Sequence, residues 1–392
     1  MPVSAKIVEF GKKSSWIRKM FEEGARLKKE HGPQNVFDFS LGNPNLDPTN
    51  TVKNAIVEAA KDDTSGVHAY MPNAGLPATR AAVAQKIRED EGIAIDENHV
   101  VMTVGAGGAL NVIFKTILNP GDEVIVPKPF FVEYTFYADN HGGKAVLVPT
   151  LEDFSLDLSA IEGAITPKTA AVLINSPNNP TGKVYSERDV NALGKLLERK
   201  SSEIGRGILL ISDEPYRGIT YDGVVVPSIF KAYGNSMVAT SFSKDLSIPG
   251  ERLGYIAVNP GVSDKPATID GLVLCNRILG FVNAPALIQR AVRGVLRDIV
   301  DVSVYKRRRD RLYEALTSFG YQCVKPEGAF YLFPKSPLAD DVEFVARLQK
   351  KLVLTVPGTG FGGPGYFRIA YCVSDETIEG SLKGFEEAIK EL

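Results

Sequence analysis

The 392-residue sequence predicts an α/β fold with two parts of unequal size. Between positions 99 and 258, predicted strands alternate with predicted helices, the pattern of a mostly parallel sheet covered by helices. Residues 169–174 are almost continuously apolar, as expected for a strand buried on both faces. After Tyr321 strands and helices mix differently. We therefore expect a large domain with a seven-stranded sheet, and a small α+β domain formed by the N-terminal arm and the C-terminal part.

The N-terminal region predicts an extended arm and a helix over residues 1–35, and a strand over 37–41 that ends in a turn cluster at 42–45. Two further helices, 49–60 and 78–91, precede the sheet. The predicted sheet strands are 99–104, 123–126, 145–148, 169–174, 208–212, 236–241 and 254–258. The predicted helices between them are 109–118, 132–140, 158–165 and 187–198.

The C-terminal third is predicted to be mostly helical over 270–319, followed by short strands at 330–333, 353–356 and 366–370. The basic run Lys306–Arg309 is interpreted as a solvated helix face. These elements divide the chain into three segments. They are an arm with part of the small domain at 1–48, the large domain at 49–285, and the rest of the small domain at 286–392.

Composition and charge exclude several classes of function. A formal net charge of -2 gives no basic surplus for binding nucleic acid or anionic lipid. Three separated cysteines without a CxxC pair argue against a disulfide framework or a zinc site, and no metal site is expected. No apolar run is long enough for a bilayer, and the first residues lack the core of a signal peptide. We expect a cytoplasmic protein that binds neither nucleic acid nor membrane.

Polar and small residues follow the predicted strands at the edge where parallel sheets bind ligands. The first strand is followed by Gly105-Ala106-Gly107-Gly108, whose backbone N–H groups could approach an anion at a helix N-terminus. A tight strand–helix turn is the alternative. The strand over 169–174 is followed by Asn175-Ser176-Pro177-Asn178-Asn179-Pro180-Thr181-Gly182, in which prolines stiffen the backbone around Asn179.

Two later strand ends add charged groups. Asp213 follows an apolar strand, and a buried carboxylate there needs a partner such as a protonated ring nitrogen, with Tyr216 near enough to share the site. A helix N-cap is the alternative for Asp213. After the next strand, Ser241, Ser243 and Arg252 are natural phosphate ligands, and Lys244 is the nucleophilic amine among them. A phosphate cradle, a carboxylate for a pyridinium, a phenol, an amide and a lysine together indicate pyridoxal phosphate.

The sequence resembles the class I/II aminotransferases of the fold-type I pyridoxal-phosphate family, of which aspartate aminotransferase is an example. The resemblance covers nearly the whole chain. It rests on motifs in the family's order: NSPNNPTG at 175–182, SDEPY at 212–216, SFSK at 241–244 with Arg252, GAFY at 328–331, PGTGFG at 357–362 and FRIAY at 367–371.

The resemblance implies an enzyme that moves an amino group between an L-amino acid and a 2-oxo acid by a ping-pong mechanism. Lys244 would carry the Schiff base of pyridoxal phosphate, and Asp213 would pair with its ring nitrogen. Asn179 and Tyr216 would contact the phenolic oxygen, and Phe131 would stack on the ring unless it is core packing. Ser241, Arg252 and the backbone of Ala106 and Gly107 would hold the phosphate.

Three further residues follow from the resemblance. Arg368 would bind the substrate α-carboxylate through a bidentate fork, with the backbone of Gly42 closing over it. Tyr70 would reach the phosphate of a neighbouring subunit, which implies a homodimer. The role of Ser243 stays open.

One departure and two alternatives concern the reaction. Family members acting on dicarboxylic substrates place a cation for the distal carboxylate, in one subgroup a lysine in the glycine loop, but residues 105–108 contain none. An arginine of a partner subunit, for example at position 277, could replace it, so the amino acid substrate stays open. A carbon–sulfur β-lyase on the same fold is the second interpretation. An aminotransferase-like regulatory domain is disfavoured because no DNA-binding module fits before residue 37.

Overall fold

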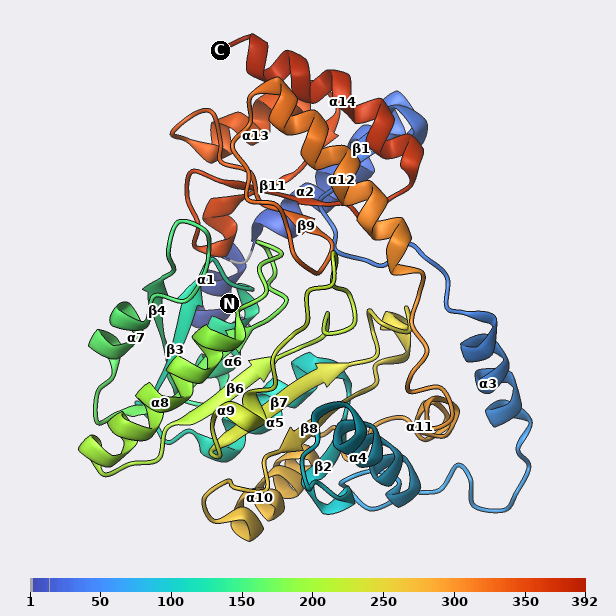
Figure 1. Ribbon diagram of the computed structural model, residues 1–392. Helices are drawn as coiled ribbons and strands as arrows, with labels where there is room; N and C mark the ends of the chain where they lie inside the picture. The colour runs from blue at the N-terminus through green and yellow to red at the C-terminus, as the bar shows by residue number, and fades with distance from the viewer. Residues whose placement is uncertain (1–2, 14) are drawn as a thin grey trace.

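The computed structural model describes residues 3–13 and 15–392, which form a large sheet part and a smaller part above it (Figure 1). The helices of the large part are α3 (Asn50–Lys61), α4 (Pro77–Glu91), α5 (Gly105–Ile117), α6 (Glu133–Asn140), α7 (Leu158–Ala164), α8 (Glu187–Ile204), α9 (Ile229–Ala232), α10 (Lys265–Ile278) and α11 (Ala286–Val292). The remaining helices lie near the two ends of the chain and are α1 (Ala5–Lys13), α2 (Ser15–His31), α12 (Val302–Phe319), α13 (Asp341–Lys350) and α14 (Asp375–Lys390).

Within the described part of the chain, seven strands form the large sheet in the order β2-β8-β7-β6-β5-β3-β4. Their bounds are β2 (Val100–Thr103), β3 (Glu123–Lys128), β4 (Lys144–Pro149), β5 (Thr169–Asn175), β6 (Leu209–Asp213), β7 (Ser236–Ser241) and β8 (Gly254–Val258). Strand β8 runs antiparallel to both of its neighbours, and the other adjacent pairs are parallel. The predicted fold class, a mostly parallel seven-stranded sheet, is confirmed.

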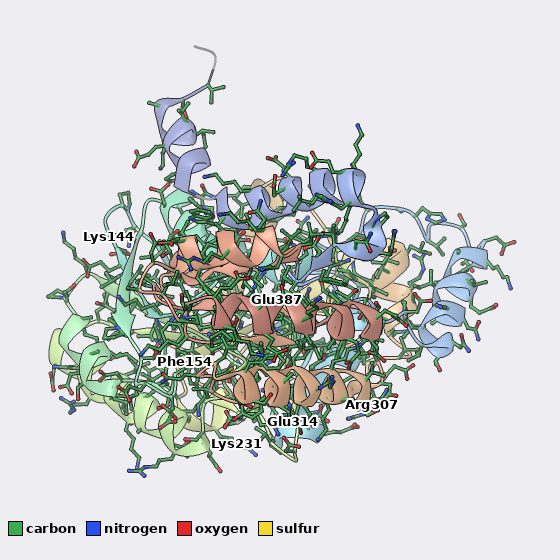
Figure 2. All side chains as sticks on the ribbon, turned by 90° about the horizontal axis from the view of Figure 1, so that it is seen from above. Lys144, Phe154, Lys231, Arg307, Glu314 and Glu387 are labelled. Carbon is green, nitrogen blue, oxygen red and sulfur yellow. The ribbon has the colours of Figure 1, made fainter. Side chains whose placement is uncertain are left out.

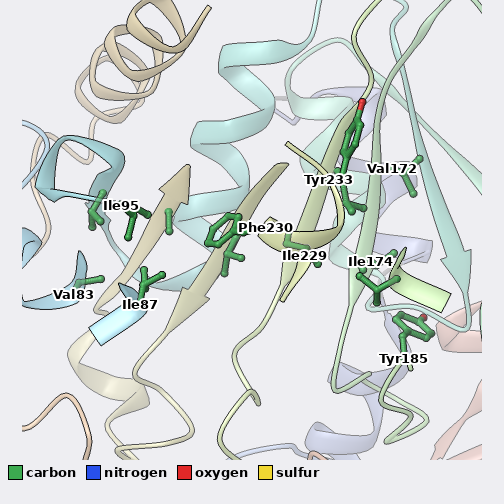
Figure 3. Packing of buried hydrophobic residues seen from close by; sticks show 14 of the residues in the cluster. Val83, Ile87, Ile95, Val172, Ile174, Tyr185, Ile229, Phe230 and Tyr233 are labelled. Atoms are coloured by element: carbon green, nitrogen blue, oxygen red, sulfur yellow. The ribbon is translucent and has the colours of Figure 1, made fainter. Parts of the chain in front are cut away.

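Both faces of this sheet are buried, which explains the apolar strands. On one face Val172 and Ile174 of β5 belong to a continuous buried cluster that extends to residues of α4 and α9, such as Val83, Ile87 and Phe230 (Figure 3). On the opposite face the neighbouring residues of β5 pack beneath α5, α6 and α10. Alternate residues of one strand therefore point into two separate cores, so each strand is apolar along its whole length.

The small part combines both ends of the chain. Strand β1 (Phe37–Asp38) pairs in parallel with β10 (Val353–Leu354), while β11 (Val356–Pro357), β12 (Phe367–Ala370) and β9 (Tyr331–Leu332) form an antiparallel sheet. Helices α12 and α14 lie side by side over this part (Figure 2). No helix among residues 3–13 and 15–392 is long and apolar enough to cross a bilayer.

The packing of α11 bears on the boundary expected at residue 286. Helix α11 lies against α3, and its Ile288 and Val292 belong to the same buried cluster as the sheet residues of β5. Residues 286–292 therefore pack with the large sheet rather than with the small part. We propose that the small part resumes where α12 begins, at Val302.

Two local predictions were wrong. The basic run is only half a solvated face, because Arg307 is exposed but Arg308 and Arg309 are buried. Arg309 lies over the ring of Tyr221 and donates to the carboxylates of Asp222 and Asp310, which take the place of water around the buried guanidinium. Helix α5 begins at Gly105 rather than at residue 109, so the glycines form its first turn.

Candidate active site

A cavity of about 340 Å³ lies at the carboxyl ends of β5, β6 and β7, between the two parts of the molecule. It is lined by nearly all of the predicted site residues. These are Gly42, Ala106, Gly107, Phe131, Asn179, Asp213, Tyr216, Ser241, Lys244, Arg252 and Arg368, together with Ser243. Tyr70 is not among them, because its side chain is 92% exposed. Arg277 lies exposed on α10, also outside the cavity.

Lys244 follows β7 and points its amine into the cavity. Its Nζ donates to the carbonyl oxygen of Gly42 at 2.9 Å and lies 5.8 Å from the ring centroid of Tyr216 and 5.5 Å from that of Phe330. Burial lowers the pKa of Lys244 from 10.5 to about 8, and nearby Arg252 and Arg368 act in the same direction. A larger fraction of this amine is therefore unprotonated at neutral pH than in an ordinary lysine.

Asp213 is the last residue of β6 and lies at the floor of the cavity. Its Oδ2 accepts a hydrogen bond from the hydroxyl of Tyr134 at 2.5 Å, whereas its buried Oδ1 has no partner among the described residues. Burial raises the pKa of Asp213 to about 7, against the effect of the Tyr134 hydrogen bond. Asp213 caps no helix, because a turn follows it. Its free oxygen is suited to a cationic N–H donor.

Asn179 is held by the rigid loop after β5. Its backbone N–H donates to Oδ1 of Asn175 at 2.7 Å, and Nδ2 of Asn175 donates to the carbonyl oxygen of Asp213 at 2.8 Å. The loop is thereby tied to the end of β6. Opposite it, the hydroxyls of Tyr216 and Tyr331 lie 2.7 Å apart. Asn179, Tyr216 and Tyr331 thus present polar groups to the same cavity.

A cradle for an anion forms where α5 begins beside Arg252. Gly105 has a φ of +80°, which favours glycine, and a Cβ added to it would lie 2.9 Å from Nη2 of Arg252 and push that guanidinium away. The backbone at Ala106 and Gly107 and the buried side chains of Ser241 and Ser243 line the same end of the cavity. Helix N-terminus, hydroxyls and guanidinium together suit a phosphate dianion.

Arg368 reaches the cavity from β12 in the small part. It donates to Oδ1 of Asn179 at 3.1 Å and to the carbonyl oxygen of Ser40 at 2.6 Å, while its buried Nε has no partner within the described chain. Its guanidinium carbon lies 4.8 Å from the ring centroid of Tyr331. A Cβ added to Gly42 would lie 2.0 Å from the Tyr331 hydroxyl, so glycine is required there. A buried guanidinium with an unused donor suits a carboxylate.

Several lining residues have no role in the sequence-based prediction: Glu133, Tyr134, Tyr137, Asn175 and Tyr331. Three of them lie on α6, where the spacing of Glu133 and Tyr137 places them on the same helix face. These three residues could have been found from the sequence because α6 directly follows β3, at the ligand-binding edge of the sheet.

Within the described residues, no group of three or more His, Cys, Asp or Glu side chains is arranged to hold a metal ion.

Taken together, an unpartnered carboxylate oxygen, a glycine-lined anion cradle and a low-pKa lysine fit pyridoxal phosphate. The model of the family "Aminotransferase class I and II" matches residues 34–384. The chain belongs to this family. The family members are pyridoxal-phosphate enzymes, and the predictions of the fold and of aminotransferase activity are confirmed.

Individual aminotransferases match over almost the whole chain. The Aspartate/prephenate aminotransferase of Thermus thermophilus is 35% identical over 90% of each chain. The Aromatic-amino-acid aminotransferase 2 of Thermococcus litoralis is 31% identical over 96% of each chain. The crystal structure of an aminotransferase from Eubacterium rectale has a TM-score of 0.97 and 41% identity, covering 100% of this chain and 99% of that one. These names favour an aminotransferase over a β-lyase or a regulatory domain, and they differ in the substrates they give.

Proposed function

We propose that this aminotransferase holds pyridoxal phosphate in the cavity and uses it to move an amino group between an L-amino acid and a 2-oxo acid. The observation that supports this best is the presence of two unusual groups in the lining of one cavity. They are Lys244, whose amine has a low pKa, and Asp213, whose buried Oδ1 has no partner in the described chain. A covalent anchor and a counter-ion for a ring cation are what this cofactor requires.

The other residues complete the proposed binding mode. Arg252, Ser241 and the backbone at Ala106 and Gly107 would hold the phosphate, and Phe131 would lie against the ring. Asn179 and Tyr216 would bind the phenolic oxygen. Arg368 would bind the substrate α-carboxylate, under the backbone of Gly42. Each of these residues lines the same cavity, so one ligand can touch all of them.

Bound pyridoxal phosphate supplies an aldehyde that amines condense with and a ring that accepts electrons from the substrate α-carbon. Lys244 Nζ would hold the aldehyde until the substrate amine replaces it. The freed Nζ, which is unprotonated more often than that of an ordinary lysine because of its lowered pKa, would then take the α-proton of the substrate and return it to the cofactor. Asp213 would keep the ring nitrogen protonated. Because the amino acid leaves as a 2-oxo acid before the second substrate enters, ping-pong kinetics are expected.

The experiment is a substrate panel on the purified protein loaded with pyridoxal phosphate. Each L-amino acid is mixed alone with the enzyme, and the absorbance change of the cofactor and the 2-oxo acid product are recorded. Steady turnover should require both an amino acid and a 2-oxo acid, with parallel double-reciprocal lines. Release of ammonia and pyruvate from cysteine without any 2-oxo acid would instead support the β-lyase.

The pKa of Lys244 predicts how cofactor attachment depends on pH. Because only the unprotonated amine is a nucleophile, attachment to the apoprotein should accelerate as the pH rises through about 8 and level off above it. An ordinary lysine would continue to accelerate to about pH 10.4. Stopped-flow absorbance after mixing apoprotein with the cofactor measures this, with N-acetyl-lysine as the control for titration of the cofactor itself. A midpoint near that of N-acetyl-lysine would contradict the prediction.

We further propose a homodimer in which Tyr70 completes the site of the neighbouring subunit. Tyr70 is 92% exposed and lies outside its own cavity. Tyr70→Ala should weaken cofactor binding by about tenfold or more, the size of one hydrogen bond to a charged group. Mixing this variant with inactive Lys244→Ala should restore activity, because one site of the mixed dimer then has both native residues. If mixing restores nothing, each site is built by one chain.

The cytoplasmic location stays a prediction.

A further inference from the structure

Glu133 is a carboxylate on the wall of the cavity that the proposed chemistry leaves without a task. It is the first residue of α6, two positions after Phe131. Among the described lining residues, Lys244, Arg252 and Arg368 are basic, and Asp213 and Glu133 are acidic. Asp213 is committed to the cofactor ring in the proposed function. Glu133 is therefore the acidic lining residue to which the proposed function assigns no task.

The position of Glu133 at the start of α6 accounts for one of its two carboxylate oxygens. The side chain accepts a hydrogen bond from the backbone N–H of Glu133 itself, and acidic side chains are favourable at a helix N-terminus. The other oxygen, Oε2, is buried and has no hydrogen-bond partner within the described chain. Burial raises the pKa of Glu133, and the charge of Arg368 opposes this shift. A hydrogen-bond acceptor is thus left over in the same cavity as the guanidinium that we assign to the substrate α-carboxylate.

Among the described lining residues, Gly107, Tyr137 and Glu133 form a stretch of wall without a cation for a second substrate carboxylate, and nearby Arg252 is assigned to the phosphate. Gly107 of the glycine loop has no side chain. A Cβ added to it would lie 3.0 Å from the hydroxyl of Tyr137. Tyr137 fills that direction, and the charge of Glu133 is one cause of its raised pKa. The wall formed by Gly107, Tyr137 and Glu133 therefore offers a phenol and a carboxylate.

We propose that Glu133 selects amino acids whose side chain ends in an N–H donor, an amide or an ammonium, over those ending in a carboxylate. This inference rests on the proposed function. A substrate held by Arg368 and Lys244 extends its side chain along the remaining wall. There an N–H group gains a charge-assisted hydrogen bond, whereas a second carboxylate meets a like charge in a partly dehydrated site. The aspartate named for relatives such as the Thermus thermophilus enzyme would then be a poor substrate here.

Glutamine and glutamate form the decisive pair because they have the same shape, as do asparagine and aspartate. The half-reaction of the holoenzyme is followed by the absorbance of the cofactor, with each amino acid alone and over a range of concentrations. We expect kcat/KM for the better amide to exceed that of its acid by at least about tenfold, mostly through KM. Ornithine and lysine test the ammonium in the same way.

Variants assign this preference to Glu133. Glu133→Gln should reduce the preference to about twofold or less with kcat largely kept, since the charge is lost but the shape is not. Glu133→Asp should retain part of the preference. Glu152→Gln, an exposed acid outside the cavity, should leave it unchanged. A preference for amides that persists undiminished in Glu133→Gln would overturn the assignment.

A binding measurement separates this inference from the proposed function. Calorimetry on the holoenzyme compares maleate with maleamate, which differ only in one carboxylate, and needs no turnover. Tighter binding of maleamate is expected, with the difference largely lost in Glu133→Gln. If glutamate and aspartate react faster than their amides and maleate binds more tightly, the inference fails while the aminotransferase stands. If no amino acid changes the cofactor spectrum, the proposed function itself fails.

Discussion

Lys244→Ala is expected to lower the rate of amino transfer by about 10³-fold or more, because it removes both the covalent anchor and the base. The amine of Lys244 is the lysine amine that lines the cavity, where it hydrogen bonds to Gly42. Steady-state kinetics with saturating cofactor give the rate. Borohydride reduction followed by mass spectrometry gives the attachment site, and the cofactor should no longer be trapped on the peptide containing residue 244.

Lys244→Arg is the matched control for charge. It keeps a cation in the cavity but offers no nucleophile at neutral pH, so it should be as inactive as the alanine variant. It should still retain the cofactor noncovalently better than the alanine variant if charge contributes to binding. Covalent trapping of the cofactor at another lysine in either variant would show that Lys244 is not the anchor.

Asp213→Asn should reduce kcat/KM by at least about 10²-fold. The substitution keeps the size of the side chain but removes the negative charge, and breaking one buried ion pair costs about 3–5 kcal/mol. The free Oδ1 of Asp213 is where a ring cation would be held, so its loss removes the group that keeps the ring protonated. Kinetics and the pH dependence of the bound cofactor's absorbance measure the two effects.

Tyr134→Phe provides the comparison for this prediction. It leaves the Asp213 carboxylate in place and removes only the 2.5 Å hydrogen bond to Oδ2, so its effect should be clearly smaller. If Asp213→Asn is no worse than Tyr134→Phe, the carboxylate is not the counter-ion of the ring. The order of the two effects therefore tests the assigned role rather than the general stability of the site.

The site residues at strand ends could be predicted because parallel strands share one ligand-binding edge. Asn179 and Lys244 follow β5 and β7, and Asp213 is the last residue of β6, the strand between them in the sheet. Their meeting in one cavity is a consequence of strand order, whereas the apolar runs in the sequence indicate only where the strands lie. The fold class was predicted for the same reason.

Other features depend on contacts that no local pattern reports. Tyr134 and Tyr137 look like core aromatics in sequence, and only the rotation of α6 about its axis points them at Asp213 and Gly107. Arg309 looks like a surface residue until Asp222, distant along the chain, supplies its partner. The position of α11 likewise follows from its contact with α3 rather than from its own sequence.

The hydrogen bonds of Arg368 tie together regions that are far apart along the chain. This side chain comes from β12 near the C-terminus, and it bonds Ser40 near the N-terminus and Asn179 in the middle. A ligand that joins Arg368 to Lys244 would act as a noncovalent cross-link between the two parts. By thermodynamic linkage, its binding free energy would add to the resistance of their interface to opening. Substrate occupancy would then protect the interface against proteolysis and hydrogen exchange.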